Sequence, residues 1–209
     1  MESNQNPYQV NAAVDRQLDL RSSLDTAMWF GVVGIICGAI GGFLLESDAR
    51  GAVTTASVLI GPGLVFGAGM AFALWRFVPN TRAMGRWLFP PIALLGFGLI
   101  GLLFDYASFK WSAQQPLWKL WAILSVHAIP GVVLLMLGSL VVAKPKFWVR
   151  LIGVGVVVTL ITGACPLLTN ISPGVYRPGP RFFVAMFLAQ LSMFLLFGWV
   201  FGDTIQEED

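Results

Sequence analysis

Few reactive side chains in this sequence have the neighbouring residues that catalysis or ligand binding would need. His127 is the only histidine, and it lies inside an apolar segment. A haem held between helices generally needs two axial ligands, commonly two histidines. A serine protease needs its serine beside the histidine, whereas Ser139, in the nearest Gly-Ser motif, lies about 18 Å away along the same predicted helix. We therefore expect neither a haem site nor a serine protease.

The other common catalytic and metal-binding patterns are missing as well. Paired carboxylates, a nucleophile with a base, and a phosphate-binding loop do not occur where they could meet. Cys37 and Cys165 both lie inside apolar segments, where a thiol usually serves as packing, and there is no Cys-x-x-Cys pair. We expect a protein that is not an enzyme, with no catalytic residue, no metal ligand and no cofactor. The net charge of +2 gives no reason to expect a nucleic-acid partner.

Three polar side chains lie at the same depth in three successive apolar segments. His127, Thr162 and Gln190 are each about 11–12 Å from one end of the predicted helix, at 1.5 Å per residue. An unsatisfied polar group in hydrocarbon costs several kcal/mol, so each side chain should face protein or water. Two arrangements follow. Either the three form a shared polar layer, or each bonds separately to a nearby backbone carbonyl, such as one freed by Pro130.

Glycines recur every four residues in the first two apolar segments. They are Gly34, Gly38 and Gly42 in the first and Gly63 and Gly67 in the second. Small residues at this spacing form a helix face that lets a second backbone approach closely. We interpret both ladders as packing faces between spans of this chain; a dimer interface or a hinge is the alternative.

Several prolines fall inside the apolar segments. Pro62 and Pro130 lie deep enough to kink their helices, and Pro166 lies near the far end of the fifth segment. Pro90 and Pro91 are expected in the first turn of the third helix, where a missing N–H costs little. Kinks free backbone carbonyls that a neighbour must satisfy. We interpret these kinks as structural, with a role in gating as the alternative.

The composition identifies the elements that must position these residues. The chain has 209 residues, of which 56% are hydrophobic and 11% charged, and its mean hydropathy is +0.76. A soluble domain is typically about 25% charged. Six apolar runs are each close to the roughly 20 residues that a helix needs to cross a hydrocarbon core of about 30 Å. The runs are 27–45, 52–75, 87–104, 120–142, 147–169 and 182–202.

These runs predict an all-α integral membrane protein, a bundle of six transmembrane helices within residues 27–202. All eight tryptophans lie at or just beyond the end of a run, where indole rings prefer the membrane interface. Residues 1–26 are expected to form a polar tail, in which Ala13–Leu24 has the pattern of a short amphipathic helix. Residues 203–209 are expected to form an acidic tail.

The distribution of basic residues predicts the orientation. With the N-terminus inside, eight Lys and Arg side chains are cytoplasmic and five are external, which agrees with the positive-inside rule. Both termini are then cytoplasmic. The opening Asn6-Pro7-Tyr8-Gln9 resembles that of small bacterial membrane proteins over four residues only, with no implication for activity. We expect the protein to be integral to a bacterial cytoplasmic membrane.

Two functions fit these features. The first is a non-catalytic accessory or scaffold protein, whose partners are the lipid bilayer and other membrane proteins or a second copy bound through the small-residue faces. The alternative is a passive or facilitative conduit for a small, largely uncharged solute, lined by polar residues of the last three spans. No Asp, Glu, Lys or Arg lies in the middle of a run, which disfavours ion-coupled transport. We prefer the first interpretation.

The orientation is tested by labelling single cysteines, introduced into a cysteine-free background, with a membrane-impermeant reagent. Cysteines that replace Lys110 and Arg177 should react from outside the cell. Cysteines that replace Pro145 and Glu207 should react only after the membrane is opened. The reason is that the loops rich in basic residues stay in the cytoplasm. An external residue 207 in intact cells would mean that the number of spans or the orientation is wrong.

Overall fold

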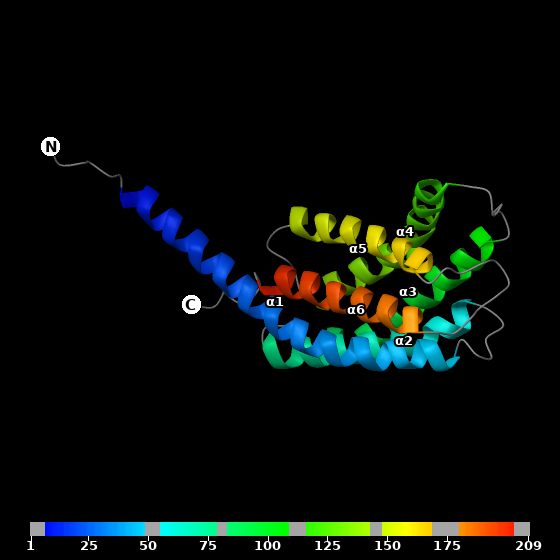
Figure 1. Cartoon of the computed structure of the whole chain (residues 1–209). Helices are drawn as coiled ribbons and strands as arrows, with labels where there is room; N and C mark the ends of the chain where they lie inside the picture. Colours follow the sequence, from blue (N-terminus) through cyan, green and yellow to red (C-terminus); the bar gives the residue numbers. More distant parts are fainter. Residues whose placement is uncertain are drawn as a thin grey trace.

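Apolar segments without a two-residue alternation fold as helices in lipid, because a helix satisfies its own backbone hydrogen bonds. A computed structural model describes residues 7–48, 55–78, 83–108, 116–142, 148–168 and 180–202, and these residues form six helices (Figure 1). The helices are α1 (Pro7–Asp48), α2 (Thr55–Phe77), α3 (Ala83–Ser108), α4 (Leu117–Val142), α5 (Trp148–Leu168) and α6 (Pro180–Phe201).

Five of the helices are long and apolar enough to cross a membrane, over Ser22–Leu45, Ser57–Phe77, Arg86–Ala107, Leu117–Leu140 and Phe183–Phe201. In α5 the apolar stretch is shorter, Val149–Cys165, so a sixth crossing stays a prediction. Large apolar side chains are also exposed around the outside, on a scale that water would not tolerate. Helix length, hydropathy and this outer surface indicate an integral membrane protein.

The helices form a closed ring. Each helix packs against the next one along the chain, and α6 returns to pack against α1, which is the most extensive contact between any two helices (Figure 1). Neighbours in the ring run in opposite directions. We call the end at which α1 enters the ring the terminal end; it also holds the end of α2 and the start of α3. The opposite end is the far end.

The first helix differs from the expected arrangement of a separate tail and span. Pro7–Asp48 is a single helix of 42 residues, and its first half projects beyond the ring (Figure 1). The expected amphipathic segment, Ala13–Leu24, is therefore a continuation of the first span and not a separate helix. A proline suits the start of such a helix because the first N–H groups have no partner in the helix. The expected acidic tail at 203–209 lies outside the described residues.

The first glycine ladder packs against the backbone of α6. A Cβ added to Gly38 would lie 3.0 Å from the carbonyl oxygen of Phe187, and one added to Gly42 would lie 2.8 Å from that of Phe183. One turn earlier, a Cβ on Gly34 would lie 3.3 Å from the Cα of Leu191. Each step of four residues forward along α1 corresponds to a step of four residues backward along α6, so the contact repeats once per turn between two antiparallel helices.

The same pairing continues towards the terminal end with the small residues on the other helix. A Cβ on Gly198 of α6 would lie 2.8 Å from the Cα of Ala27, and one on Gly202 would lie 2.5 Å from the Cα of Ser23. The close contact thus runs from Ser23 to Gly42 along α1, a rise of about 28 Å at 1.5 Å per residue. It spans nearly the whole hydrocarbon thickness of about 30 Å.

The second glycine ladder packs against α3. A Cβ on Gly63 would lie 2.9 Å from the Cβ of Phe97, and one on Gly67 would lie 2.6 Å from the Cα of Pro90. The glycines of both ladders therefore lie against neighbouring helices of the same chain, where their missing side chains allow the close approach.

Phenylalanine rings fill the space between α2, α3 and α6. The ring of Phe66 lies at the centre, 5.2 Å from that of Phe194 and 5.4 Å from that of Phe97, measured between centroids. Phe89 and Phe197 lie farther out, each 6.3 Å from Phe66. All five side chains are buried. Tilted and edge-on rings at these separations are favourable aromatic contacts.

The expected proline positions are partly different. Pro62 and Pro130 lie inside α2 and α4, and each helix continues through its proline. Pro166 lies near the end of α5, as expected from its position in the run. The third helix begins at Ala83, before the start of its apolar run, so Pro90 and Pro91 lie inside the helix and not in its first turn. The apolar run marks the span, whereas the helix extends beyond it.

The α1–α6 contact predicts the effect of Gly38→Leu on stability. The new side chain would meet the backbone of α6, which cannot move aside without separating the helices. Overpacking of this kind costs about 1–3 kcal/mol, and the melting temperature in detergent should fall by about 2–4 °C for each kcal/mol. The matched control is Gly153→Leu, since a Cβ on Gly153 has nothing within 4 Å. Equal melting temperatures for the two variants would contradict the contact.

Candidate functional site

Gln190 is the most deeply buried polar residue of the predicted layer. It lies in α6 with no exposed surface, and its Nε2 donates a hydrogen bond of 2.9 Å to the carbonyl oxygen of Pro62 in α2. The amide also fills the notch at Gly41 of α1, where an added Cβ would lie only 2.6 Å from Nε2. One side chain thus joins three helices. A hydrogen bond between membrane helices contributes about 0.6–2 kcal/mol.

The other amide atom of Gln190 has no hydrogen-bond partner. Its Oε1 is buried, and the Oγ of Ser125 is in the same condition. A buried polar atom without a partner costs about 1–3 kcal/mol. The two atoms belong to helices on different sides of the ring, α6 and α4, so they do not mark one polar site.

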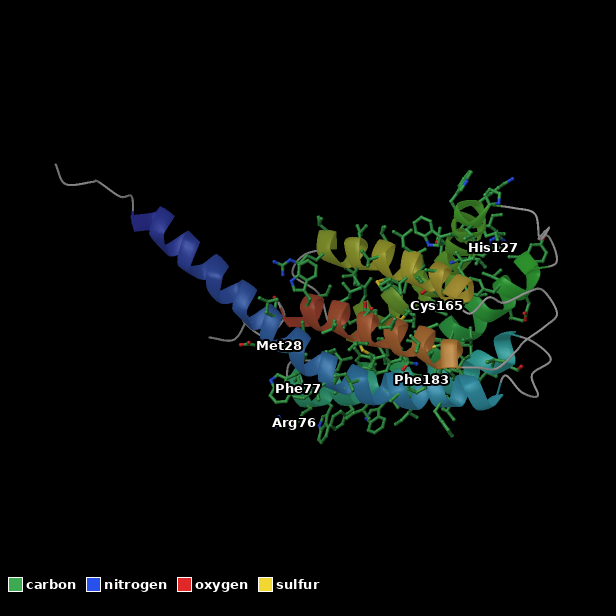
Figure 2. The ribbon with its side chains drawn as sticks, in the orientation of Figure 1. Met28, Arg76, Phe77, His127, Cys165 and Phe183 are labelled. Carbon is green, nitrogen blue, oxygen red and sulfur yellow. The ribbon has the colours of Figure 1, made fainter. Side chains whose placement is uncertain are left out.

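Thr162 and His127 each bond within their own helix. The Thr162 hydroxyl donates to the carbonyl oxygen of Val158 at 2.7 Å. His127 Nδ1 lies 2.7 Å from the carbonyl oxygen of Ile123. A carbonyl oxygen can only accept, so Nδ1 carries the proton in this bond. The imidazole centroid of His127 also lies 6.3 Å from the ring centroid of Tyr106. His127 lies near the far end of the helix bundle (Figure 2).

The three residues of the predicted layer therefore bond to three separate backbone carbonyls. No hydrogen bond joins any two of His127, Thr162 and Gln190. The depth predicted to be equal for the three is not accompanied by direct hydrogen bonding, and the bonds match the alternative of separate carbonyls. A layer joined by water stays a prediction. His127 bonds to the carbonyl oxygen of Ile123. The carbonyl that Pro130 leaves without its helical partner is a different one, that of Val126, four residues before the proline.

An open space lies on the outer surface, between α4 and α5. A groove of about 680 Å³ extends from Ser125 to Leu140 along α4 and from Leu151 to Leu160 along α5. Towards the far end, α4 and α5 are joined by a hydrogen bond of 3.0 Å from Trp121 Nε1 to the carbonyl oxygen of Leu160. Its walls are apolar and include Val126, Val133, Leu137, Ile152, Val156 and Leu160.

The groove was not expected from the sequence. Its exposed residues, such as Val126 and Ile152, have the same composition as side chains that simply face lipid. A weak signal was present on α5, where Gly155, Thr159 and Gly163 recur every four residues. Gly163 receives the backbone of Ser125 at a distance that leaves no room for a side chain, while Gly155 and Thr159 line the groove.

Neither a group of metal-binding side chains among the described residues nor a match to a known protein points to another site. Within the part of the chain that the structure describes, no three His, Cys, Asp or Glu side chains are grouped to hold a metal ion. No protein-family model, curated protein or solved structure matches this chain.

The separate bonding of the polar residues predicts that they act independently. Gln190→Leu and Thr162→Val should each change the free energy of unfolding, and the double variant should change it by the sum, with a coupling energy below about 0.5 kcal/mol. The measurement is denaturant unfolding in mixed micelles of detergent and lipid. A coupling energy above about 1 kcal/mol would indicate that water joins the two side chains in a shared layer.

Proposed function

We propose that this chain is a non-catalytic membrane accessory protein that binds a transmembrane helix of another membrane protein in the α4–α5 groove. The observation that carries the proposal is the location of open space. The interior between α2, α3 and α6 is filled by phenylalanine rings, whereas the groove of about 680 Å³ opens on the outer surface.

The length of the groove favours a helix over a lipid tail. From Ser125 to Leu140 the groove follows α4 for about 22 Å at 1.5 Å per residue. One leaflet provides about 15 Å of hydrocarbon, half of the core. A tail from one leaflet would cover part of this length, whereas a membrane-crossing helix would cover all of it.

The residues on the α5 side suit close helix packing. Gly155 and Thr159 both line the groove one turn apart, and the Thr159 hydroxyl is already bonded to the carbonyl oxygen of Gly155 at 2.8 Å. Gly155 and Thr159 therefore form a ridge of small residues in the groove. The Thr159 hydroxyl needs no hydrogen bond from an apolar partner helix, because it already has one. Small residues let a second backbone approach and gain van der Waals contact, which is a main source of helix association in lipid.

The alternative of a conduit has less support. A conduit lined by polar residues needs groups that can meet the solute, whereas the three mid-membrane candidates each bond to the protein's own backbone, and the one atom among them that is buried without a partner, Gln190 Oε1, is enclosed by the protein. The phenylalanine cluster occupies the space beside Gln190. We therefore rank the accessory function first.

We also propose that the protein lies in a bacterial cytoplasmic membrane with both termini in the cytoplasm. Gly202, after α6, packs against Ser23, so α6 ends beside the point at which α1 enters the ring. The count of eight basic residues inside and five outside supports the direction. Six crossings, including α5, are part of this proposal.

The docking proposal is tested with a photoreactive amino acid in native membranes. Placed at Val133, which is 46% exposed in the groove, it should give one adduct of defined mass with another membrane protein. Placed at Ile36, on the outer face of α1 and 57% exposed, it should give lipid adducts only. Gly155→Leu should remove the Val133 adduct by filling the groove.

Gly153→Leu on the same helix is the matched control, because it adds the same bulk outside the groove. The Gly155→Leu variant should keep its fold, since a Cβ there meets only Met136, at an ordinary contact distance of 3.5 Å. Lipid adducts alone at Val133, or the same protein adduct at Val133 and Ile36, would contradict the proposal. An adduct with twice the mass of this chain would show that the groove binds a second copy of the chain and not another membrane protein.

A further inference from the structure

A second hollow lies between α2 and α3 at the terminal end, away from the α4–α5 groove. Its volume is about 540 Å³. One part of its lining is apolar, and the other part consists of the Arg86 guanidinium and the indole rings of Trp75 and Trp87. The lining residues are Ala68, Ala71, Phe72 and Trp75 on α2 and Arg86, Trp87 and Pro90 on α3.

The position of these side chains matches the order of layers in a membrane. Trp75 lies two residues before the end of α2, and Arg86 lies three residues after the start of α3. Both are at the level where indole rings and basic side chains meet lipid headgroups. Ala68 lies about 10 Å deeper than Trp75 along α2, at 1.5 Å per residue, in the region of the acyl chains.

The exposure of the indole rings is high for such large side chains. Trp87 is 81% exposed and Trp75 is 61% exposed, so neither is needed to fill the interior of the ring. Trp75 is supported on one side by Phe72, whose ring centroid lies 6.0 Å away. Both indole rings line the hollow, together with Arg86.

We propose that this hollow binds an anionic phospholipid from the surrounding leaflet, with its phosphate at the Arg86 guanidinium and one acyl chain along Ala68 and Ala71. Alanine at these two positions, one turn apart on the same face, leaves the trough that the chain fills. Basic pockets between membrane helices are suited to anionic headgroups. A guanidinium has five N–H donors in a planar fork that matches a phosphate, so it can hold the lipid together with contacts inside the protein.

The charge around the hollow favours an anionic over a zwitterionic lipid. The residues that line it include one cation and no anion. The start of α3 at Ala83 adds the positive end of the helix dipole at the same level. Two other arginines at this end rest on aromatic rings elsewhere: Arg76 is 5.7 Å from the ring of Phe77, and Arg150 is 4.9 Å from that of Trp199. Arg76 and Phe77 lie at the terminal end of α2 (Figure 2).

The test measures lipid binding to the full chain in detergent by native mass spectrometry, with phosphatidylglycerol and phosphatidylcholine of the same chain length. The wild-type chain should bind phosphatidylglycerol more tightly. Arg86→Gln should weaken phosphatidylglycerol binding about tenfold, the loss expected when a charge-assisted hydrogen bond is removed. Its binding of phosphatidylcholine should change little. Arg150→Gln, which removes the same charge at the same end of the ring, should retain the preference.

A second variant keeps the test decisive if Arg86→Gln does not fold. Trp87→Ala truncates an exposed side chain, so the ring of helices should remain intact, and it should weaken the binding of both lipids by removing part of the lining of the hollow. Equal binding of the two lipids by the wild-type chain would overturn the proposal. So would unchanged binding in Trp87→Ala, or equal losses in Arg86→Gln and Arg150→Gln, which would show a general attraction of charge.

Discussion

The close approach of the α1 and α6 backbones is the constraint on which the rest of the ring depends. Lipid chains are as apolar as leucine, so two membrane helices gain little from the hydrophobic effect and must gain van der Waals contact. Gly38 and Gly42 on one helix, and Gly198 and Gly202 on the other, provide it by removing the side chains that would hold the backbones apart. This contact joins the last helix to the first and closes the ring.

The consequences of that closure determine where a partner could bind. With α6 held against α1, Gln190 reaches the carbonyl oxygen of Pro62, and Phe194 and Phe197 enter the cluster around Phe66. The interior between these helices is then filled by side chains. Helices α4 and α5 come into close contact where Ser125 meets Gly163, and from Ser125 to Leu140 along α4 the two helices leave an apolar groove. The proposed accessory function follows from this contrast between a filled interior and an open outer surface.

Hydropathy and helical periodicity predicted part of this arrangement, because both are local properties. Run length located the spans, and the spacing of Gly34, Gly38 and Gly42 identified a packing face. The partner of that face is α6, about 150 residues away in the sequence, and no local signal names it. Depth along a helix also follows from residue number, but rotation about the helix axis depends on packing. For this reason residue number predicted one depth for His127, Thr162 and Gln190 but not that they bond to separate carbonyls.

The most direct test of the ring closure is a solid-state NMR measurement of carbon–carbon contacts in lipid bilayers. Glycine and phenylalanine are labelled together in one sample, and a second sample mixes chains labelled with glycine only and with phenylalanine only. The account predicts Cα–Cα cross-peaks for Gly38 with Phe187 and for Gly42 with Phe183 in the first sample, and none in the mixed sample. Cross-peaks that persist in the mixed sample would place the glycine ladder in a dimer interface and contradict the closed ring.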